Sequence, residues 1–460
     1  MQRVDVIVIG GGPAGSTAAG FLAQAGANVR LFERDRFPRY HIGESLLSAT
    51  LPILEALGVG PAIENAGFIR KPGGTFVWGS RAEPWSFFFR EDPGGRPYAY
   101  HVLRSQFDEI LLRHAAALGV DVREGHCVEA VQHNGTTRVV ARDEHGARVE
   151  VEARYVIDAS GQQALLGRRD RLREFNPFFK NLAVFGYFAE AERLAGAVDG
   201  NILSAAFGDG WFWFIPLHDG TTSVGAVVDA HRFAGAAAGD PAALYTRLIA
   251  ACAPVAERLR VARLVSPVRV IRDYSYCSRR FYGPGYLLAG DAACFIDPVF
   301  STGVHLACLS GYLASQAVGA ILRGGPEAAE QARYDARYRA GFERYLNFLY
   351  FFYDHHSDPD SYFWTARKIL SPDVPLDART AFVRLLSGGG DLLHGDATLE
   401  QELAARHARM TAATGGNRFA AVPGSDLFRV RATIREIQGD VEPSPADDDA
   451  ATRRGKPSDS

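Results

Sequence analysis

The sequence predicts a mixed α/β (α+β) fold in which a mainly antiparallel sheet is inserted into a βαβ domain and a helical region follows. Three observations predict it. A β-branched run at 4–9 leads through a glycine loop into a helical pattern, alternating aromatic residues fill 180–235, and helical spacing dominates beyond about 325. A chain of 460 residues is also long enough for more than one domain.

Composition excludes several classes of protein. With 47% hydrophobic and 22% charged residues, the chain is ordinary for a globular protein. A net charge of -3 lacks the basic excess typical of nucleic-acid binders. Five cysteines without a CxxC pair disfavour disulfides or a zinc site, so a cytoplasmic location without a metal is expected.

No signal peptide or membrane span is expected. Asp5 interrupts the apolar stretch at the N-terminus, and a glycine loop follows at once. The segment 298–322 contains no charged residue, but its His, Ser and Gln side chains make it too polar for a confident span. A buried core helix is the better interpretation.

The N-terminal elements predict a Rossmann-like dinucleotide-binding domain. A buried parallel strand over Val4–Ile9 precedes a helix over Ser16–Ala25 and a second strand over Val29–Phe32. Between the first strand and the helix lies a loop that contains Gly10, Gly12, Pro13, Ala14 and Gly15. Its glycines permit close approach of a pyrophosphate to the helix N-terminus. Glu33, after the second strand, can accept the ribose hydroxyls, and the acid makes the motif specific.

The middle of the chain predicts further helices and the inserted sheet. Apolar residues recur at helical spacing over 46–57 and 105–118. Asp219-Gly220 separates the strands Phe212–Leu217 and Thr222–Val228, which is a strong hairpin signal. The inserted sheet is expected at about 76–100 and 180–270, within a core that spans 1–330.

A helical region that covers the substrate is expected over 331–440. Its segment Phe342–Trp364 holds ten aromatic residues and is expected to form this substrate cover. The final residues, 441–460, contain almost no large apolar side chain and are expected to be disordered.

Two motifs resemble the FAD-dependent monooxygenase superfamily that includes the aromatic hydroxylases. They are Tyr286–Asp291, where a strand ends in Gly-Asp, and His101–Asp108. The resemblance implies that the dinucleotide is FAD, that Asp291 contacts its ribityl oxygens and that Arg104 lies near the flavin. Without the flanking motif, Arg104 would be interpreted as half of a surface salt bridge.

The segment Gly210–Pro216 narrows the resemblance to the flavin-dependent halogenases. It contains W-x-W-x-I-P, in which Trp211 and Trp213 point to the same face of a strand. A tryptophan pair alone would indicate an aromatic core, but the trailing Ile-Pro is similar to the halogenase motif. The implied role is a wall between flavin and substrate.

Lys71 precedes a Pro-Gly-Gly turn and resembles the catalytic lysine of the same family. A lone lysine is usually solvated. In an apolar pocket, however, a lysine has a lowered pKa and can act as a neutral amine or a hydrogen-bond donor. Glu44, in the segment His41–Leu46 that also resembles the family, is the nearest candidate carboxylate for Lys71, with a helix cap as the alternative.

The loop Asp297–Val304 resembles the family's loop beside the flavin ring. The resemblance implies that Pro298 and Gly303 lie near the flavin and that backbone N–H groups of Thr302 and Gly303 bind the halide. A helix N-terminus suits an anion because its N–H groups lack partners. The alternative is an ordinary side-chain cap of that helix.

Phe300 departs from the halogenases of free tryptophan, which carry a catalytic Glu at this position. A phenylalanine cannot accept a proton. The chain instead resembles the branch that acts on phenols and pyrroles, often tethered to an acyl or peptidyl carrier protein in natural-product and antibiotic biosynthesis. Phe300 and Tyr350 are weak candidates for substrate contacts, and core packing is the more ordinary role for Tyr350.

The resemblance implies a two-component FADH2-dependent halogenase. A separate flavin reductase supplies FADH2, O2 converts it to C4a-hydroperoxyflavin, and this oxidises chloride or bromide to hypohalous acid, which Lys71 relays to the substrate ring. Ser160 stands where aromatic hydroxylases carry the Asp of an Asp-Gly pair, which disfavours a nicotinamide site. The resemblance leaves open which halide is used, which ring is modified, and whether the flavin is covalently bound.

Three other functions compete with halogenation. An aromatic hydroxylase explains the glycine loop, Glu33 and Asp291 but not Lys71 together with the tryptophan motif. A flavin reductase of prenyl chains would use the apolar C-terminal region as a lipid groove. A non-catalytic flavoprotein could bind a carrier protein as a scaffold.

Overall fold

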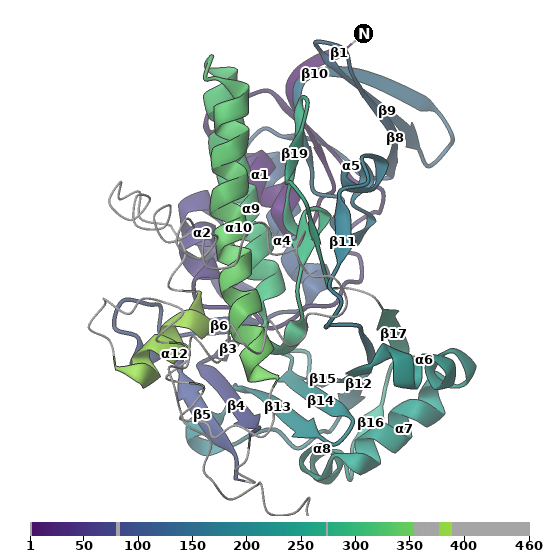
Figure 1. The fold of residues 1–460 in the computed structure, drawn as a ribbon, viewed down its shortest axis with the longest axis vertical. Helices are drawn as coiled ribbons and strands as arrows, with labels where there is room; N and C mark the ends of the chain where they lie inside the picture. Colours follow the sequence, from purple (N-terminus) through teal and green to yellow (C-terminus); the bar gives the residue numbers. More distant parts are fainter. Residues whose placement is uncertain are drawn as a thin grey trace, which may run out of the picture. The chain divides into compact units, whose positions relative to one another are not determined.

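The computed structural model describes residues 2–79, 83–272, 275–353 and 377–388, together with Tyr362 and Ala366. Two large sheets dominate this part of the chain (Figure 1). The predicted mixed α/β fold with an inserted, mainly antiparallel sheet is confirmed.

The first sheet is built around β1 (Gln2–Ile9), which pairs in parallel with β2 and with β10. Its residues 6–8 are fully buried, which explains a continuous β-branched run rather than an alternating one. The other strands of this sheet are β2 (Val29–Phe32), β7 (Asp121–Arg123), β8 (His126–His133), β9 (Thr137–Asp143), β10 (Arg148–Asp158), β19 (Tyr282–Gly283) and β20 (Tyr286–Leu288).

Helix α1 (Pro13–Gln24) begins three residues before the expected helix at Ser16. Proline is favoured at the first helical position, because its missing N–H would have no partner there and its φ is already helical. This part of the chain also contains α2 (Thr50–Leu57), α3 (Gly60–Asn65), α4 (Arg104–Ala117) and α5 (Leu165–Arg169), of which α4 packs against α1 and β7.

Residues 46–49 are not helical, contrary to the expected helix over 46–57. The backbone around them bonds to β6 (Ala99–His101) instead: Leu46 N donates to Tyr100 O, and Ser45 forms a bridge with His101. We call residues 40–46 the strap. A strap bonded to β6 is held in one position against the rest of the domain.

The second sheet is antiparallel except for the pairing of β13 with β4. Its strands are β4 (Gly73–Val77), β5 (Trp85–Phe88), β12 (Asn181–Ala189), β13 (Ile202–Phe207), β14 (Gly210–Pro216), β15 (Thr221–Asp229), β16 (Arg263–Leu264) and β17 (Arg269–Arg272). The predicted hairpin at Asp219-Gly220 joins β14 to β15. The expected segment 76–100 supplies β5 but not β6, which pairs with β3 (Ile69–Lys71) in a separate two-stranded sheet.

One face of the second sheet is covered by α6 (Ala230–Gly239), α7 (Pro241–Ala251) and α8 (Ala253–Arg258). On β14, Phe212 and Phe214 point into this core. The alternation of side chains along a strand then directs the residues between them to the other face. A third, small sheet joins β11 (Arg173–Phe175), β18 (Tyr276–Ser278) and β21 (Cys294–Phe295).

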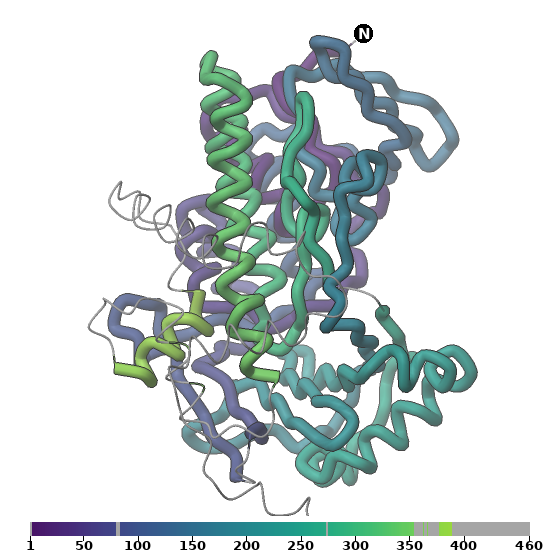
Figure 2. Tube along the Cα trace, viewed as in Figure 1, coloured from purple at the N-terminus to yellow at the C-terminus, as the bar shows by residue number. Residues whose placement is uncertain are grey.

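Helix α9 (Thr302–Leu322) packs against α1 and α10 (Glu327–Phe352), as the trace in Figure 2 shows. By length and composition it could cross a membrane, but 78% of its apolar window is buried inside the protein. This agrees with the prediction of a buried helix. Helices α10 and α12 (Ala378–Ser387) begin the predicted helical C-terminal region, and the expected tail at 441–460 lies outside the described residues.

Candidate active site

A cavity of about 480 Å³ opens at the carboxyl ends of the parallel strands of the first sheet. Ile9, Phe32 and Ala289, at or beside the ends of β1, β2 and β20, contribute to its wall. Ligands of open α/β sheets bind at this edge. Of the predicted flavin-binding residues, those that line the cavity are Gly10, Gly12, Pro13, Ala14, Glu33, Arg104, Asp291, Pro298 and Gly303.

The glycine loop keeps the cavity floor at the level of the backbone. Gly10 has φ +102°, and a Cβ on it would lie 2.3 Å from Ala159 O. Gly15 does not line the cavity, but its Cβ would lie 1.9 Å from Gly10 O. Only glycine allows α1 to approach β1 this closely, which leaves room for a phosphate at the helix N-terminus.

Glu33 holds the loop as well as facing the cavity. Its Oε2 accepts a hydrogen bond from Gly11 N (2.6 Å), and its Oε1 accepts one from Asp35 N (2.9 Å). The carboxylate is thus oriented by the backbone on both sides. The predicted bond to ribose hydroxyls stays a prediction.

Arg104 is buried, so the alternative of a surface salt bridge is wrong. Its guanidinium donates to both carboxylate oxygens of Asp108 (2.8 and 3.0 Å) and to Ile42 O (2.6 Å). The bond to Ile42 O ties α4 to the strap. Burial raises the pKa of Asp291 to about 6, and Arg104 opposes that rise. Both residues lie on the cavity wall.

Trp211 and Trp213 lie on β14 with ring centroids 6.2 Å apart, on the same face as predicted. Trp213 lines the cavity and donates from Nε1 to Ser223 Oγ (3.2 Å). Trp211 is fully buried and donates to the Tyr353 hydroxyl (2.8 Å). The pair thus forms one wall of the cavity, with Trp213 at its surface and Trp211 behind it.

Tyr353 connects this wall to the loop before α9. Its hydroxyl donates to Asp297 Oδ2 (2.7 Å), and Asp297 Oδ1 accepts from Val299 N (3.0 Å). Burial raises the pKa of Asp297 to about 6. These bonds hold the short helix η5 (Pro298–Phe300) in place.

Ser301 precedes α9 with φ +59°, a strained left-handed conformation for a residue with a side chain. Its side chain makes no capping bond, and Thr302 is already the first helical residue. The alternative of a side-chain cap is therefore wrong. Ser301 and Gly303 line the cavity, whereas Thr302 does not. An uncapped helix N-terminus at a cavity wall can bind an anion.

Lys71, at the end of β3, is only 2% exposed. Its Nζ donates to Leu46 O (2.9 Å) and lies 5.5 Å from the centroid of the Phe89 ring. Burial lowers the pKa of the amine to about 7. Lys71 does not line the cavity, but Glu44 and Ser45, which precede Leu46 in the strap, do. Because its pKa is about 7, a substantial fraction of the Lys71 amine is neutral at physiological pH.

The buried amine should make stability depend on pH. The folded pKa of about 7 is below the unfolded value of 10.5, so between these pH values the unfolded state binds a proton at Lys71 that the folded state does not. The contribution of Lys71 to stability is therefore fully present above pH 10.5 and is lost as pH falls toward 7. We expect the unfolding free energy of the wild type, relative to Lys71→Met, to rise by about 3–5 kcal/mol across this window. Urea denaturation at several pH values measures this. Lys180→Met, which removes an exposed lysine, controls for the lost charge, and a constant difference would contradict the prediction.

Glu44 is not the partner of Lys71, contrary to the expectation, and it caps no helix. Its Oε1 accepts a hydrogen bond from the Tyr187 hydroxyl (2.5 Å), while Lys71 bonds to Leu46 O. The carboxyl is buried on the wall of the cavity. The strap directs Glu44 toward Tyr187 of β12. The position of Glu44 in a family motif does not indicate which way its side chain points.

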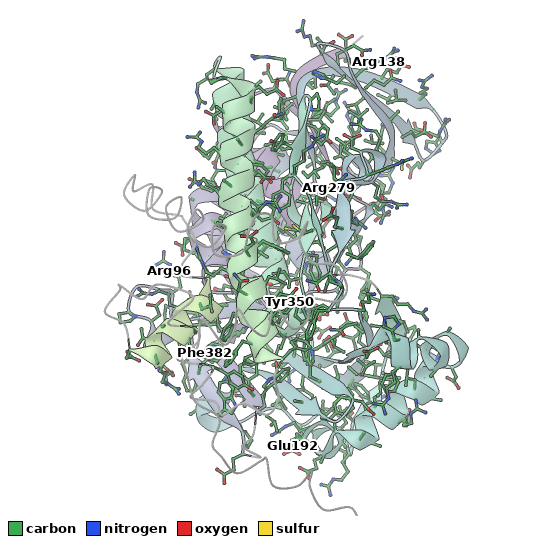
Figure 3. The ribbon with its side chains drawn as sticks, in the orientation of Figure 1. Arg96, Arg138, Glu192, Arg279, Tyr350 and Phe382 are labelled. Atoms are coloured by element: carbon green, nitrogen blue, oxygen red, sulfur yellow. The ribbon has the colours of Figure 1, made fainter. Side chains whose placement is uncertain are left out.

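Phe300 and Tyr350 lie in two aromatic clusters outside the cavity wall. Phe300 stacks on Phe348, with ring centroids 5.2 Å apart. Tyr350, labelled on α10 in Figure 3, stacks on Phe179 (5.0 Å) and accepts from Asn176 Nδ2 (2.8 Å). Core packing, the more ordinary interpretation of Tyr350, agrees with these contacts.

Three cavity or wall residues were not found from the sequence. Arg39 forms an ion pair with Asp108 (3.2 Å) and lies beside Gly12, where a phosphate would sit. Tyr187 and Tyr353 reach the site from β12 and from the end of α10. Nothing in their local sequence distinguishes them. The glycine cradle, Arg39 and Arg104 together suit an anionic dinucleotide.

Comparisons with known proteins agree with this geometry. The family described as Tryptophan halogenase matches residues 5–95 and 91–403. The "Tryptophan 2-halogenase" of Chondromyces crocatus is 37% identical over 409 residues, which cover 86% of this chain and 77% of the relative. The "1H-pyrrole-2-carbonyl-(peptidyl-carrier protein) chlorinase" of Pseudomonas fluorescens is 32% identical over 374 residues, which cover 76% of this chain and 83% of the relative.

Solved structures lead to the same family. The myxobacterial chondrochloren halogenase CndH, described as a new variant of FAD-dependent halogenases, matches with a TM-score of 0.75 and 42% identity over 89% of this chain and 97% of that one. The flavin-dependent halogenase CmlS matches with a TM-score of 0.72 and 33% identity over 94% of this chain and 77% of that one. This chain therefore belongs to the tryptophan halogenase family and is a flavin-dependent halogenase, an enzyme that uses FAD, a halide and O2.

Proposed function

We propose that this enzyme halogenates an electron-rich aromatic ring, a phenol or a pyrrole, that is tethered to a carrier protein, and that Lys71 delivers the halogen. The observation that carries the proposal is the burial of Lys71 beside the strap, which lowers the pKa of its amine to about 7. A neutral or hydrogen-bonding amine can retain hypohalous acid, which a solvated ammonium ion would not hold.

Bound FADH2 would supply the electrons that, with O2, oxidise the halide. The residues of this chain would orient and separate the reactants. Arg39 and the glycine loop would hold the pyrophosphate, Glu33 the ribose and Asp291 the ribityl chain. Backbone N–H groups at Thr302 and Gly303 would hold the halide. Trp213 would keep the aromatic substrate away from the flavin.

The region around Lys71 supports an aromatic substrate. The Phe89 ring lies next to the Lys71 amine, and Phe89 contacts Phe87, which in turn contacts Phe382 of α12. Phe382 is labelled in Figure 3. Phe382 contacts Phe348, the stacking partner of Phe300. This apolar set of rings extends from Lys71 to Phe300. By resemblance, Phe300 stands where halogenases of free tryptophan carry a Glu. A phenol or pyrrole needs less help than an unactivated ring in forming a cationic intermediate.

Tethering is supported by a relative named for a pyrrole on a peptidyl-carrier protein, whereas another relative is named for tryptophan. A single assay separates these substrates. The enzyme, FAD, a flavin reductase, NADH, O2 and bromide are mixed with phenolic and pyrrolic acyl groups on a carrier protein, with the same acids free, or with free tryptophan. Mass spectrometry then measures bromine incorporation.

We expect the carrier-bound ring to be brominated at least about tenfold faster than the free acid or tryptophan. Equal rates on free and bound rings would contradict tethering, and a preference for tryptophan would contradict the proposed ring class. A hydroxylated product without halogen would favour the aromatic hydroxylase and overturn the proposal. Monochlorodimedone, which captures hypohalous acid, reports whether the halide is oxidised when no ring is modified.

A further inference from the structure

Glu44 is a buried carboxyl group with one free oxygen on the wall of the flavin cavity. It is 2% exposed, and its Oε2 makes no hydrogen bond of normal geometry, although the nearby Ser223 hydroxyl lowers the pKa of the carboxyl. A carboxylate that served only to hold the strap would be expected to use both oxygens, because an unsatisfied buried oxygen is unfavourable. The free oxygen is therefore available to a group inside the cavity.

A chain of two phenols leads from Glu44 to the surface. The Tyr187 hydroxyl donates to Glu44 Oε1 (2.5 Å), and the Tyr40 hydroxyl lies 3.1 Å from that of Tyr187. Tyr40 is 47% exposed. Each hydroxyl can accept one proton while it donates another. Tyr40 also lines the cavity, so the three side chains form a continuous hydrogen-bonded chain along its wall, from the exposed Tyr40 to the buried Glu44 carboxyl.

The reaction of a flavin-dependent halogenase consumes one proton in the cavity. FADH2, O2, a halide ion and one H⁺ give FAD, hypohalous acid and water. The halide and the flavin each lose two electrons, and O2 gains four. The later substitution of ring hydrogen by halogen, with release of water, consumes no proton overall. That proton has to reach the reacting oxygen inside the cavity.

We propose that Tyr40, Tyr187 and Glu44 form a proton relay that carries this proton from solvent to the flavin cavity. Glu44 gives its proton to the oxygen released as the halide is oxidised. Tyr187 then reprotonates Glu44 and recovers a proton through Tyr40. The relay rests on the halogenase activity and not on the proposed substrate.

The surroundings allow Glu44 to release and regain a proton near neutral pH. Burial raises the pKa of Glu44 to about 7, and the Tyr187 and Ser223 hydroxyls and then Arg104 oppose the rise, while Asp219 adds to it. Burial raises the pKa of Tyr40 to about 12, and the charge of Arg269 opposes this rise. Burial also raises the pKa of Tyr187, by more than that of Tyr40. Both phenols thus stay protonated and act as conductors, and Glu44 is the group that titrates.

The first test measures single-turnover oxidation of the FADH2-loaded enzyme by O2 with bromide present, in H2O and D2O from pH 6 to 9. We expect Glu44→Gln and Tyr187→Phe to slow the bromide-dependent step at least tenfold and to change its pH profile and solvent isotope effect. Glu44→Asp should recover part of the rate. Tyr245→Phe, which removes a buried hydroxyl bonded to Val224 O of the same sheet, should behave as wild type. FAD affinity, measured by fluorescence, should stay within twofold in all variants.

The second test needs neither flavin nor turnover. In pH-difference infrared spectra of the flavin-free protein, the C=O intensity that disappears as pH rises through about 7 should be smaller in Glu44→Gln by one carboxyl, while the bands of Asp291 and Asp297, which titrate near pH 6, should remain. An unchanged intensity of the band that titrates near pH 7 in Glu44→Gln overturns the assignment. Wild-type rates and isotope effects in Tyr187→Phe at every pH overturn the relay. If the wild type oxidised no halide, the activity itself would fail and the relay with it, even if the infrared band behaved as expected.

Discussion

Lys71→Ala is expected to abolish halogenation of the substrate ring while FAD binding is retained. Loss of a positioned side chain that donates or accepts a proton lowers turnover by about 10²–10⁴-fold, and no other amine in the described residues contacts the Leu46 carbonyl. Because Lys71 does not line the flavin cavity, FAD affinity should change less than about twofold. Product mass spectrometry and flavin fluorescence measure the two quantities separately.

Two further variants make this result specific to the amine. Lys71→Met preserves most of the side-chain volume and should be as inactive as Lys71→Ala, since no donor remains. Arg70→Ala removes the exposed neighbouring cation, which pairs with Glu64, and should halogenate normally. Retained halogenation in Lys71→Met would show that the lysine has only a packing role, and loss of FAD in either Lys71 variant would show a folding defect.

Gly10→Ala is expected to destabilise the protein by about 3 kcal/mol or more and to eliminate FAD binding. The added methyl would lie 2.3 Å from Ala159 O, and the backbone at φ +102° disfavours any side chain. Relief of that contact requires β1 and β10 to separate at the edge that forms the cavity floor. Thermal unfolding and flavin fluorescence would be measured on the same preparation.

Gly26→Ala is the matched control for the backbone conformation. Gly26 also has a positive φ (+83°), but nothing lies within 4 Å of the position that a Cβ would occupy. We expect a loss of about 1 kcal/mol, due to the backbone conformation alone, with FAD binding intact. Equal effects of the two substitutions would contradict the steric explanation.

Much of the fold could be predicted from local sequence because local physics determines it. A β-branched run, a glycine loop and a small-residue helix predicted β1 and α1, and Asp219-Gly220 predicted the β14–β15 hairpin. Most of the predicted flavin-binding residues also line one cavity. Backbone conformation and strand alternation depend on neighbours in the chain, so their signals are present in short segments.

The errors lie where pairing partners are distant in the sequence. Residues 46–49 have helical spacing, yet Leu46, at the end of the strap, bonds to β6, more than fifty residues later. Glu44 follows a family motif, yet it bonds to Tyr187. Arg104 is not an error, because the flanking motif, and not the arginine alone, indicated that it lies at the cavity, and the packing of α4 buries it there. Burial and partner choice depend on the tertiary arrangement, which no local pattern contains.

By itself, the sequence determined the strands and helices around the glycine loop, the kind of cofactor and, through Lys71 and the Trp211–Trp213 pair, the family of the enzyme. Only the tertiary structure decided the chemical state of its side chains. Lys71 has a lowered pKa because burial between β3 and the strap excludes water from it, and Glu44 bonds to Tyr187 because β12 lies against the strap. The reason is that desolvation and hydrogen bonding act through space, and proximity in space is a property of the folded chain.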